Sequence, residues 1–183
     1  MVYLITGASG FIGSHLAEQL LKNGHSVINV DNFDDFYSYE IKVKNTLESV
    51  GQSADFEFLD KEKDIQRLIS QTASDRYKLY WQDIRDMEGL RRIFAENKID
   101  MVVHLAALAG VRPSIERPLE YADVNIKGSM NLWELCREFG IHKFVCASSS
   151  SVYGINEKIP FSETDNVDRP ISPYAATKKC GEI

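Results

Sequence analysis

A tyrosine and a lysine stand four residues apart near the end of the sequence, in Tyr174-Ala-Ala-Thr-Lys178. On a helix, positions i and i+4 lie on one face, so the two side chains would be neighbours. A free tyrosine, with a pKa of about 10, is a poor base near neutral pH, but a neighbouring ammonium group favours the phenolate. The pair therefore predicts a general base for a hydroxyl proton, unless it is a surface pair that arises by chance.

A run of serines precedes this pair, in the segment 147–154 of sequence Ala-Ser-Ser-Ser-Ser-Val-Tyr-Gly. The run follows a short apolar stretch that is typical of a strand, and an aromatic residue comes after it. A flexible serine linker would suit neither neighbour. A hydroxyl group at the end of a strand can instead hydrogen-bond a reacting oxygen and relay its proton.

The start of the sequence carries three glycines in Gly7-Ala-Ser-Gly10-Phe11-Ile12-Gly13, between a predicted strand, Val2–Thr6, and a predicted helix, Phe11–Asn23. Glycine lacks a Cβ, so the backbone can turn sharply and approach a pyrophosphate. The N-terminus of the helix adds free N–H groups and a partial positive charge. This arrangement predicts a dinucleotide site, and a tight turn without a ligand is the alternative.

An aspartate stands where such a site needs an acidic residue. Asp31 follows the second predicted strand, Ser26–Val30, and lies 18 residues after Gly13. A carboxylate there accepts hydrogen bonds from the adenosine ribose and repels a 2′-phosphate. Because neither Asn32 nor Phe33 is basic, the sequence favours NAD over NADP, unless Asp31 is only a turn residue.

Short apolar runs alternate with segments of helical period along most of the chain, which predicts an α/β fold. We expect a doubly wound parallel sheet of the Rossmann type, with its crevice between the first and fourth strands and with Gly7 and Ala106 on the two sides. The remaining predicted strands are Tyr77–Gln82, Met101–Leu105 and Lys143–Ala147, and the remaining helices are Met87–Asn97, Leu119–Phe139 and one that Pro173 opens.

The segment Asn32–Arg76 fits this pattern least well. Its first part, Asn32–Glu40, is acidic and aromatic, and the part about 52–76 looks like an insert with a polar helix around Asp64–Gln71. We interpret the insert as a solvated surface excursion, with a lid over the substrate as the alternative.

Composition excludes several classes of function. A net charge of −6 argues against a nucleic-acid partner, and no apolar run reaches the roughly 18–20 residues of a membrane span. The three cysteines have no CxxC spacing, the four histidines are scattered, and no metal-ligand cluster is visible. With no signal peptide after Met1, we expect a cytoplasmic protein of one domain.

These motifs together resemble the extended short-chain dehydrogenase/reductase superfamily, with NAD as cofactor. Asp83-Ile84 is similar to the family's adenine-holding pair, although Asp83 could equally be a helix N-cap. His104-Leu105-Ala106-Ala107 is similar to the small-residue turn beneath the cofactor, with His104 itself packed in the protein rather than ligating. The resemblance implies a cofactor site made of Gly7, Gly10, Phe11, Ile12, Gly13, Asp31, Asn32, Asp83, Ile84, Leu105, Ala106, Ala107, Tyr174 and Lys178.

Within the superfamily the chain looks most like UDP-glucuronate 4-epimerases, on Ala109-Gly-Val-Arg112, on segment 147–154 and on segment 172–179. Galactose-type epimerases usually carry a lysine where this chain has Ala109. Alignment of the Val-Tyr-Gly and Tyr-Lys motifs gives Ser149 the catalytic serine position. Dehydratases follow that position with Asp-Glu and decarboxylating relatives place Glu nearby, whereas Ser150 and Ser151 stand here. The resemblance therefore implies a hydride shuttle at C4 of a UDP-sugar, catalysed by Ser149, Tyr174 and Lys178.

The substrate is the least determined part of this expectation. Ser150 and Arg112 are candidate substrate residues; Arg112 could hold a sugar carboxylate or a phosphate, or be a loop arginine without a role. We expect residues 1–183 to be an NAD-binding Rossmann domain that is incomplete at the C-terminus, with a C-terminal substrate domain absent and a homodimeric parent enzyme. A UDP-glucose 4-epimerase, another sugar-nucleotide dehydrogenase and an NAD-binding module without turnover remain alternatives.

Overall fold

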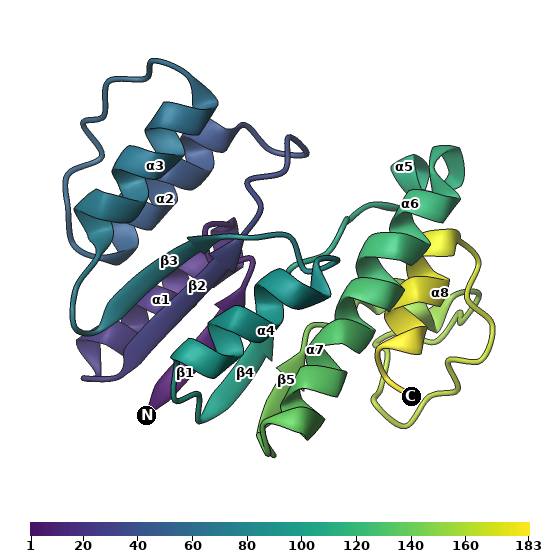
Figure 1. Ribbon diagram of the computed structural model, residues 1–183. Helices are drawn as coiled ribbons and strands as arrows, with labels where there is room; N and C mark the ends of the chain where they lie inside the picture. Colours follow the sequence, from purple (N-terminus) through teal and green to yellow (C-terminus); the bar gives the residue numbers. More distant parts are fainter.

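A single parallel sheet forms the centre of the protein, in a computed structural model that describes all residues 1–183 (Figure 1). Its five strands follow the order β3-β2-β1-β4-β5. The strands are β1 Val2–Thr6, β2 Ser26–Asp31, β3 Tyr77–Trp81, β4 Met101–His104 and β5 Phe144–Cys146. The predicted strands and the doubly wound Rossmann-type fold are confirmed.

Helices cover both faces of the sheet, and the strand sequences explain why. Successive side chains of a strand point to opposite faces, so a strand covered on both sides needs an unbroken apolar run. Leu4 and Ile5 of β1 are both fully buried, each in a different core cluster. The helices are α1 Phe11–Lys22, α2 Tyr39–Ser49, α3 Lys61–Thr72, α4 Met87–Glu96, α5 Val111–Glu116, α6 Pro118–Ala122, α7 Gly128–Glu138 and α8 Pro173–Cys180.

The two core clusters divide these helices between the faces. One cluster packs α1, α2 and α3 against the sheet, through residues such as Ala17, Leu47 and Leu68. The other packs α4 and α7 against the opposite face, through residues such as Phe94 and Leu132. Figure 1 shows α4 and α7 together in front of the sheet and the α2–α3 pair beyond β3.

The segment after β2 contains a helix that the sequence pattern did not predict. Helix α2 buries Val43 and Leu47 completely, and Ile65 and Leu68 of α3 are also fully buried. The interpretation of 52–76 as a solvated surface excursion is therefore wrong for its helix, which is part of the core. The stretch up to Asp60, the N-cap of α3, and the short turn 73–76 before β3 lie outside the helix.

The predicted helix Leu119–Phe139 is divided into three pieces. A five-residue π-helical turn, Asp123–Lys127, separates α6 from α7. Single π-helical turns inside helices commonly occur at functional sites. Gly128 follows the turn, and a Cβ there would lie 2.6 Å from Ile84 Cδ1, so α7 approaches the loop after β3 closely.

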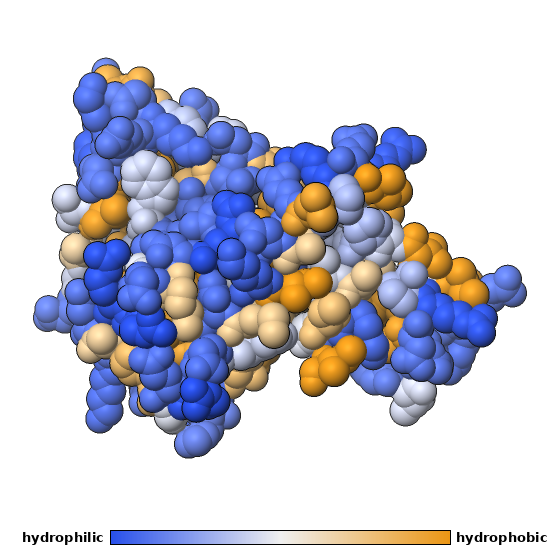
Figure 2. Space-filling view, turned by 45° about the vertical axis from the view of Figure 1, so that its right-hand side comes forward, coloured by the Kyte–Doolittle hydropathy of each residue, from blue (hydrophilic) through white to orange (hydrophobic).

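Exposed apolar side chains are frequent from α5 onward, and Figure 2 shows several hydrophobic groups around the α5–α8 region. Leu119 is 85% exposed, and Ile115, Ile155 and Ile171 are each more than half exposed. None of the helices combines the length and the apolar character that crossing a membrane requires.

Candidate active site

The glycine loop lies where the order of the strands reverses, between β1 and β4. Gly7 has φ +73° and donates its N–H to Val30 O at 2.8 Å, so the chain turns sharply as it leaves β1. A Cβ on Gly7 would lie 2.9 Å from the backbone nitrogen of Ala106. The backbone of Gly7 therefore packs directly against that of Ala106, where β1 and β4 end.

The loop has free backbone donors of the kind that a pyrophosphate requires. Gly10 is the N-cap of α1 and offers no side-chain acceptor, so the first N–H groups of the helix are available. Phe11 and Ile12 of this turn are 77% and 68% exposed. The backbone geometry thus fits a dinucleotide, and a Cβ at Gly7 or at Gly13 would clash with the backbone of the chain itself.

Gly13→Ala is expected to lower the free energy of unfolding by about 3 kcal/mol and to remove NAD binding. The new Cβ would lie 2.3 Å from Gly7 O and 2.6 Å from Ala8 Cα, so the loop must move. Chemical denaturation and NAD titration measure both effects. Gly24→Ala is the control: it has a positive φ and open space around it, so only the backbone cost of about 1–2 kcal/mol applies. Wild-type NAD binding by Gly13→Ala would contradict the assigned loop.

Asp31 lies at the end of β2 and is 4% exposed. Its Oδ2 accepts from Ser9 N at 3.2 Å, and its Oδ1 accepts from Phe33 N at 2.8 Å and from Lys42 Nζ at 3.1 Å. The aspartate is therefore at the expected place beside the glycine loop. Lys42, a cation that the sequence analysis missed, reaches it from α2.

The second acidic residue of the cofactor set, Asp83, is bound within the chain. Arg85 donates to both of its carboxylate oxygens, and Asn32 Nδ2 donates to its Oδ2 at 3.0 Å. Burial raises the pKa of Asp83, but these hydrogen bonds outweigh it and bring the pKa down to about 2. Ile84 is 5% exposed and packs in the core beneath α7. Asp83 and Asn32 are thus brought together, and Ile84 contributes mainly to packing.

His104 ends β4 and is packed, as expected. Its Nδ1 lies 2.7 Å from Thr6 Oγ1 and its Nε2 lies 2.9 Å from Ser129 Oγ. Ser129 donates to Asn125 O at 2.6 Å, so its oxygen accepts from a proton on Nε2, and Thr6 donates to Nδ1. Burial, with a smaller contribution from Lys178, lowers the pKa of His104 to about 3. The half-buried residues Leu105, Ala106 and Ala107 follow at the crevice.

Helix α8 is positioned by two features of the sequence. Ser172 caps it by accepting from Ala175 N at 3.1 Å, and Pro173 occupies its first turn. Asn125 of the π-helical turn donates to Thr177 Oγ1 at 3.1 Å, and Thr177 donates to Tyr174 O at 2.8 Å. The sequence analysis missed Asn125, and nothing in its spacing signals the contact.

Asn125→Leu is expected to lower the free energy of unfolding by about 2–4 kcal/mol. The amide of Asn125 also pairs with both backbone groups of Leu108, at 2.8 and 3.0 Å, and the variant leaves them unsatisfied. Urea denaturation measures the change. The matched control is Asn131→Leu, which removes the hydrogen bonds from Asn131 Nδ2 to the carbonyls of Ile84 and Arg85 and should cost about 1 kcal/mol. Equal losses in the two variants would contradict the role of Asn125.

Helix α8, which carries Tyr174 and Lys178, packs near the carboxyl end of β5. Lys178 Nζ donates to Ala147 O at 2.9 Å, which ties α8 to the end of that strand. Burial lowers the pKa of Lys178. Tyr174 is half-buried, with its ring edge-on to Tyr121 at a centroid distance of 6.2 Å. Lys178 hydrogen-bonds the carbonyl and not the Tyr174 hydroxyl, a detail that the i, i+4 spacing did not predict.

Ser149 is the N-cap of a 3₁₀ turn, Ser150–Tyr153, against which α8 packs. Its hydroxyl accepts from Ser151 N and bonds Ser151 Oγ, each at 3.2 Å. Ser150 and Arg112 are both exposed, and Arg112, at the start of α5, has no hydrogen-bond or ion-pair partner in the chain. The structure therefore groups Ser149 with the Tyr174–Lys178 helix and leaves Arg112 at the surface.

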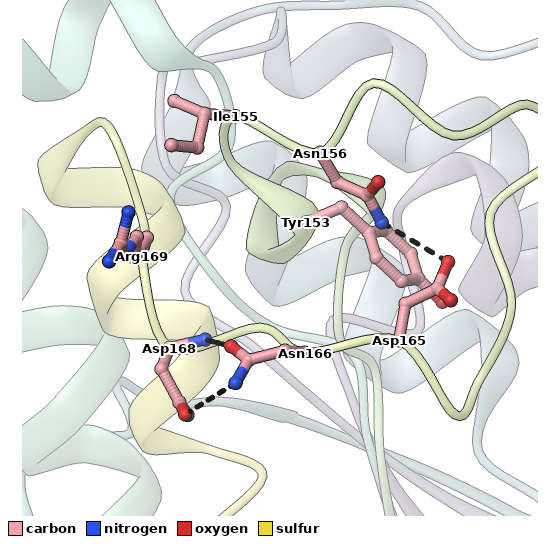
Figure 3. A pocket seen from close by; sticks show the side chains of 7 residues that line it. All are labelled: Tyr153, Ile155, Asn156, Asp165, Asn166, Asp168 and Arg169. Carbon is pink, nitrogen blue, oxygen red and sulfur yellow. Dashed lines mark hydrogen bonds between the residues drawn. The ribbon is translucent and has the colours of Figure 1, made fainter.

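The loop between the 3₁₀ turn and α8 encloses a hollow of about 680 Å³ (Figure 3). The rings of Tyr153 and Phe161 stack with a centroid distance of 4.4 Å, and the carboxylate of Asp165 accepts hydrogen bonds from Asn156 and from Lys158. None of the predicted site residues lines this hollow. Its lining residues are Tyr153, Ile155, Asn156, Asp165, Asn166, Asp168 and Arg169.

A parallel Rossmann-type sheet with a glycine loop at the reversal of strand order, a Tyr-Lys helix and a serine at the end of β5 is the arrangement of short-chain dehydrogenases/reductases. The sequence matches the NAD dependent epimerase/dehydratase family over residues 3–183. The chain belongs to this family, whose members are NAD-dependent.

Several similar proteins are named UDP-sugar 4-epimerases, and all of the proteins compared below are about twice as long as this chain. Protein CapI of Staphylococcus aureus is 45% identical over 100% of this chain and 48% of its own length. A UDP-glucuronate 4-epimerase of Thermodesulfobacterium geofontis is 42% identical over 99% of this chain and 49% of its own length. The UDP-glucose 4-epimerase of Bifidobacterium longum, solved with NAD+ and UDP, is 30% identical with a TM-score of 0.76, over 100% of this chain and 47% of its own. The chain thus spans about half the length of the relatives it matches.

Proposed function

We propose that this chain supplies the NAD site and the catalytic groups of a UDP-sugar 4-epimerase that interconverts UDP-glucuronate and UDP-galacturonate. The observation that carries the proposal is the position of α8, whose Lys178 is bonded to the end of β5 beside Ser149. In this proposal Tyr174 of α8 is the proton acceptor, beside the crevice where a dinucleotide would enter. Curated relatives named UDP-glucuronate 4-epimerase, at about 40% identity, support the choice of sugar.

The proposed mechanism uses three side chains of this chain. Tyr174, as phenolate, takes the proton of the C4 hydroxyl, and the Ser149 hydroxyl hydrogen-bonds the same oxygen. The Lys178 ammonium, one turn after Tyr174 on the same helix, supplies a positive charge beside the site of proton transfer. A dinucleotide held by the glycine loop and Asp31 would supply the hydride acceptor for this oxidation and the hydride donor for its reversal. The 4-keto sugar then rotates so that its other face is presented for reduction. Tyr174 returns the proton to the C4 oxygen, and the other C4 epimer results.

Elimination and decarboxylation need further acid or base groups that this site does not present. The two residues after Ser149 are Ser150 and Ser151, and a serine hydroxyl is a poor acid or base near neutral pH. The nearest acidic side chain to the serine run is Glu182, which accepts from Ser148 Oγ. These residues favour a reversible oxidation at C4, which requires no such carboxyl group.

The cofactor site is expected to bind NAD more tightly than NADP. Calorimetric titration of the 183-residue chain with both nucleotides measures the preference. The carboxylate of Asp31 repels a 2′-phosphate while it accepts from an unmodified ribose, so the preference should be at least about tenfold. Equal affinity for the two nucleotides would remove the proposed role of Asp31.

A second candidate function is an NAD-binding module that gains activity only with further polypeptide. The chain spans about half of its relatives, and apolar side chains such as Leu119 and Ile171 are exposed near α8. We propose that the sugar-binding groups belong to the half that these relatives have in addition, and that the complete enzyme is a homodimer. Incubation of the chain with NAD and UDP-glucuronate, followed by ion-pair chromatography, distinguishes the candidates, since turnover by residues 1–183 alone contradicts the second.

A further inference from the structure

We propose that Lys42 is a specificity-determining residue, and that the Asp31–Lys42 pair, rather than Asp31 alone, sets the choice between NAD and NADP. Lys42 Nζ lies 3.1 Å from Asp31 Oδ1, and the two side chains are only 11% and 3% exposed. A buried ion pair is sensitive to the loss of either partner, because the remaining charge is then uncompensated. The state of each group therefore depends on the other.

Helix α2 holds Lys42 in a fixed position relative to the glycine loop. One turn further along the helix, Asn45 Nδ2 donates to Ser9 O at 3.1 Å and Thr46 Oγ1 donates to Ser9 Oγ at 2.9 Å. Ser9 is fully buried and donates its own N–H to Asp31. The loop, the carboxylate and the lysine thus form one connected unit, in which α2 holds the backbone of Lys42 beside Asp31.

The pair lies where a 2′-phosphate would enter. In dinucleotide folds, the carboxylate at this strand end accepts from the ribose 2′-hydroxyl, which places the 2′ oxygen one hydrogen bond from Asp31. Lys42 Nζ lies one hydrogen bond from the same carboxylate. An ammonium group is a strong partner for phosphate, but here its charge is engaged by Asp31.

Asp31 thus excludes NADP in two ways, through its own charge and by engaging Lys42. Without the aspartate charge, Lys42 becomes an uncompensated cation beside the 2′ position. The sequence showed no basic residue directly after Asp31, and α2 supplies one from eleven residues later.

Calorimetry of the 183-residue chain with NAD and NADP tests this inference in four forms: wild type, Asp31→Asn, Lys42→Met and the double variant. Asp31→Asn should bind NADP at least about tenfold more tightly than wild type, and NAD about tenfold more weakly, since each change involves a charged hydrogen bond. The double variant should lose the NADP gain. Lys42→Met alone should widen the preference for NAD over NADP, because the negative charge of Asp31 then has no cation beside it and repels the 2′-phosphate more strongly.

Two further variants separate specificity from folding. Lys44→Met removes the same charge from an exposed position of α2 and should leave both affinities unchanged. Asp31→Asn combined with Lys42→Arg keeps a cation and should keep the NADP gain. An NADP gain that survives in the Asp31→Asn/Lys42→Met variant would overturn the proposal and point to another cation, such as Arg85. Absence of the gain in Asp31→Asn would overturn it as well, while NAD binding by wild type would leave the proposed function intact.

Discussion

Acidification from pH 7 to about 4.5 is expected to lower the free energy of unfolding by roughly 3 kcal/mol through His104 alone. The pKa of this histidine is about 3 in the folded chain, because of its burial and, less, because of Lys178, and about 6.5 when the chain is unfolded. Between these values the unfolded state binds more protons than the folded state, so stability falls as the pH falls. Two pH units below 6.5, at about 1.4 kcal/mol each, give the expected loss. Denaturation at pH 7, 6, 5 and 4.5 measures it.

The hydrogen bonds of His104 explain why the folded state resists protonation. Thr6 donates to Nδ1, so a proton on Nδ1 would remove an acceptor from a fully buried threonine. His104→Gln removes the titrating group, and its stability should vary little over the same range. His142→Gln, at an exposed position, should keep the wild-type pH dependence. Asp83 contributes little to the measurement, because its pKa of about 2 in the folded chain and of about 3.9 in the unfolded chain both lie below pH 4.5. An identical pH dependence in wild type and His104→Gln would show that another group controls acid stability.

The parallel sheet was predictable because its strands are covered on both faces. Such strands appear in a sequence as short unbroken apolar runs, and Leu4 and Ile5 illustrate the cause, since neighbours of one strand enter opposite cores. The position of the crevice followed from strand order. Helix α2 escaped prediction because three of its five buried positions are the polar residues Lys42, Thr46 and Ser49, which weaken the apolar period.

The candidate site was predictable where one element carries the whole pattern. The glycine loop and the Tyr174–Lys178 spacing each lie within a single strand-turn-helix or helix, so local geometry determines them. Contacts between separate elements were not predictable. Asn125 reaches Thr177 across 52 residues of sequence, and Lys178 bonds Ala147 O across 31. Both contacts depend on how α8 docks against the π-helical turn and β5, which composition and periodicity do not describe.

These contacts change the interpretation of the Tyr-Lys motif. Because Lys178 is bonded to the carbonyl of Ala147, its ammonium group is fixed relative to β5 and to the serine run that follows it. The lysine is thereby a structural link of α8 as well as a charge near Tyr174. Substitution of Lys178 would mix the two effects, so Tyr174 is the residue at which the proposed chemistry can be tested by itself.

Tyr174→Phe is expected to lower the rate of UDP-glucuronate epimerisation by about 10²–10⁴-fold while leaving NAD affinity within about twofold. The test requires an active form, such as a chimera that joins this chain to the additional half of the Thermodesulfobacterium geofontis relative, with which it shares 42% identity. The phenylalanine ring keeps the edge-on contact with Tyr121, so the packing of α8 is preserved. Only the phenolic oxygen, the proposed proton acceptor, is removed. Chromatographic separation of the two UDP-uronates over time gives the rate, and calorimetry gives the NAD affinity.

Two control variants separate the chemical step from the structure of the helix. Ser149→Ala should cost less than Tyr174→Phe, because a water can partly replace its hydroxyl. Tyr153→Phe removes a phenolic oxygen from a ring that stacks on Phe161 outside the catalytic group, and it should keep nearly the full rate. A Tyr174→Phe chimera that still forms UDP-galacturonate at the parent rate would rule out Tyr174 as the base. If NAD affinity fell as much as the rate, the main role of Tyr174 would be cofactor binding. The Tyr174→Phe variant keeps the glycine loop and the carboxylates of Asp31 and Asp83, so the loss of a proton acceptor alone would leave NAD affinity nearly unchanged.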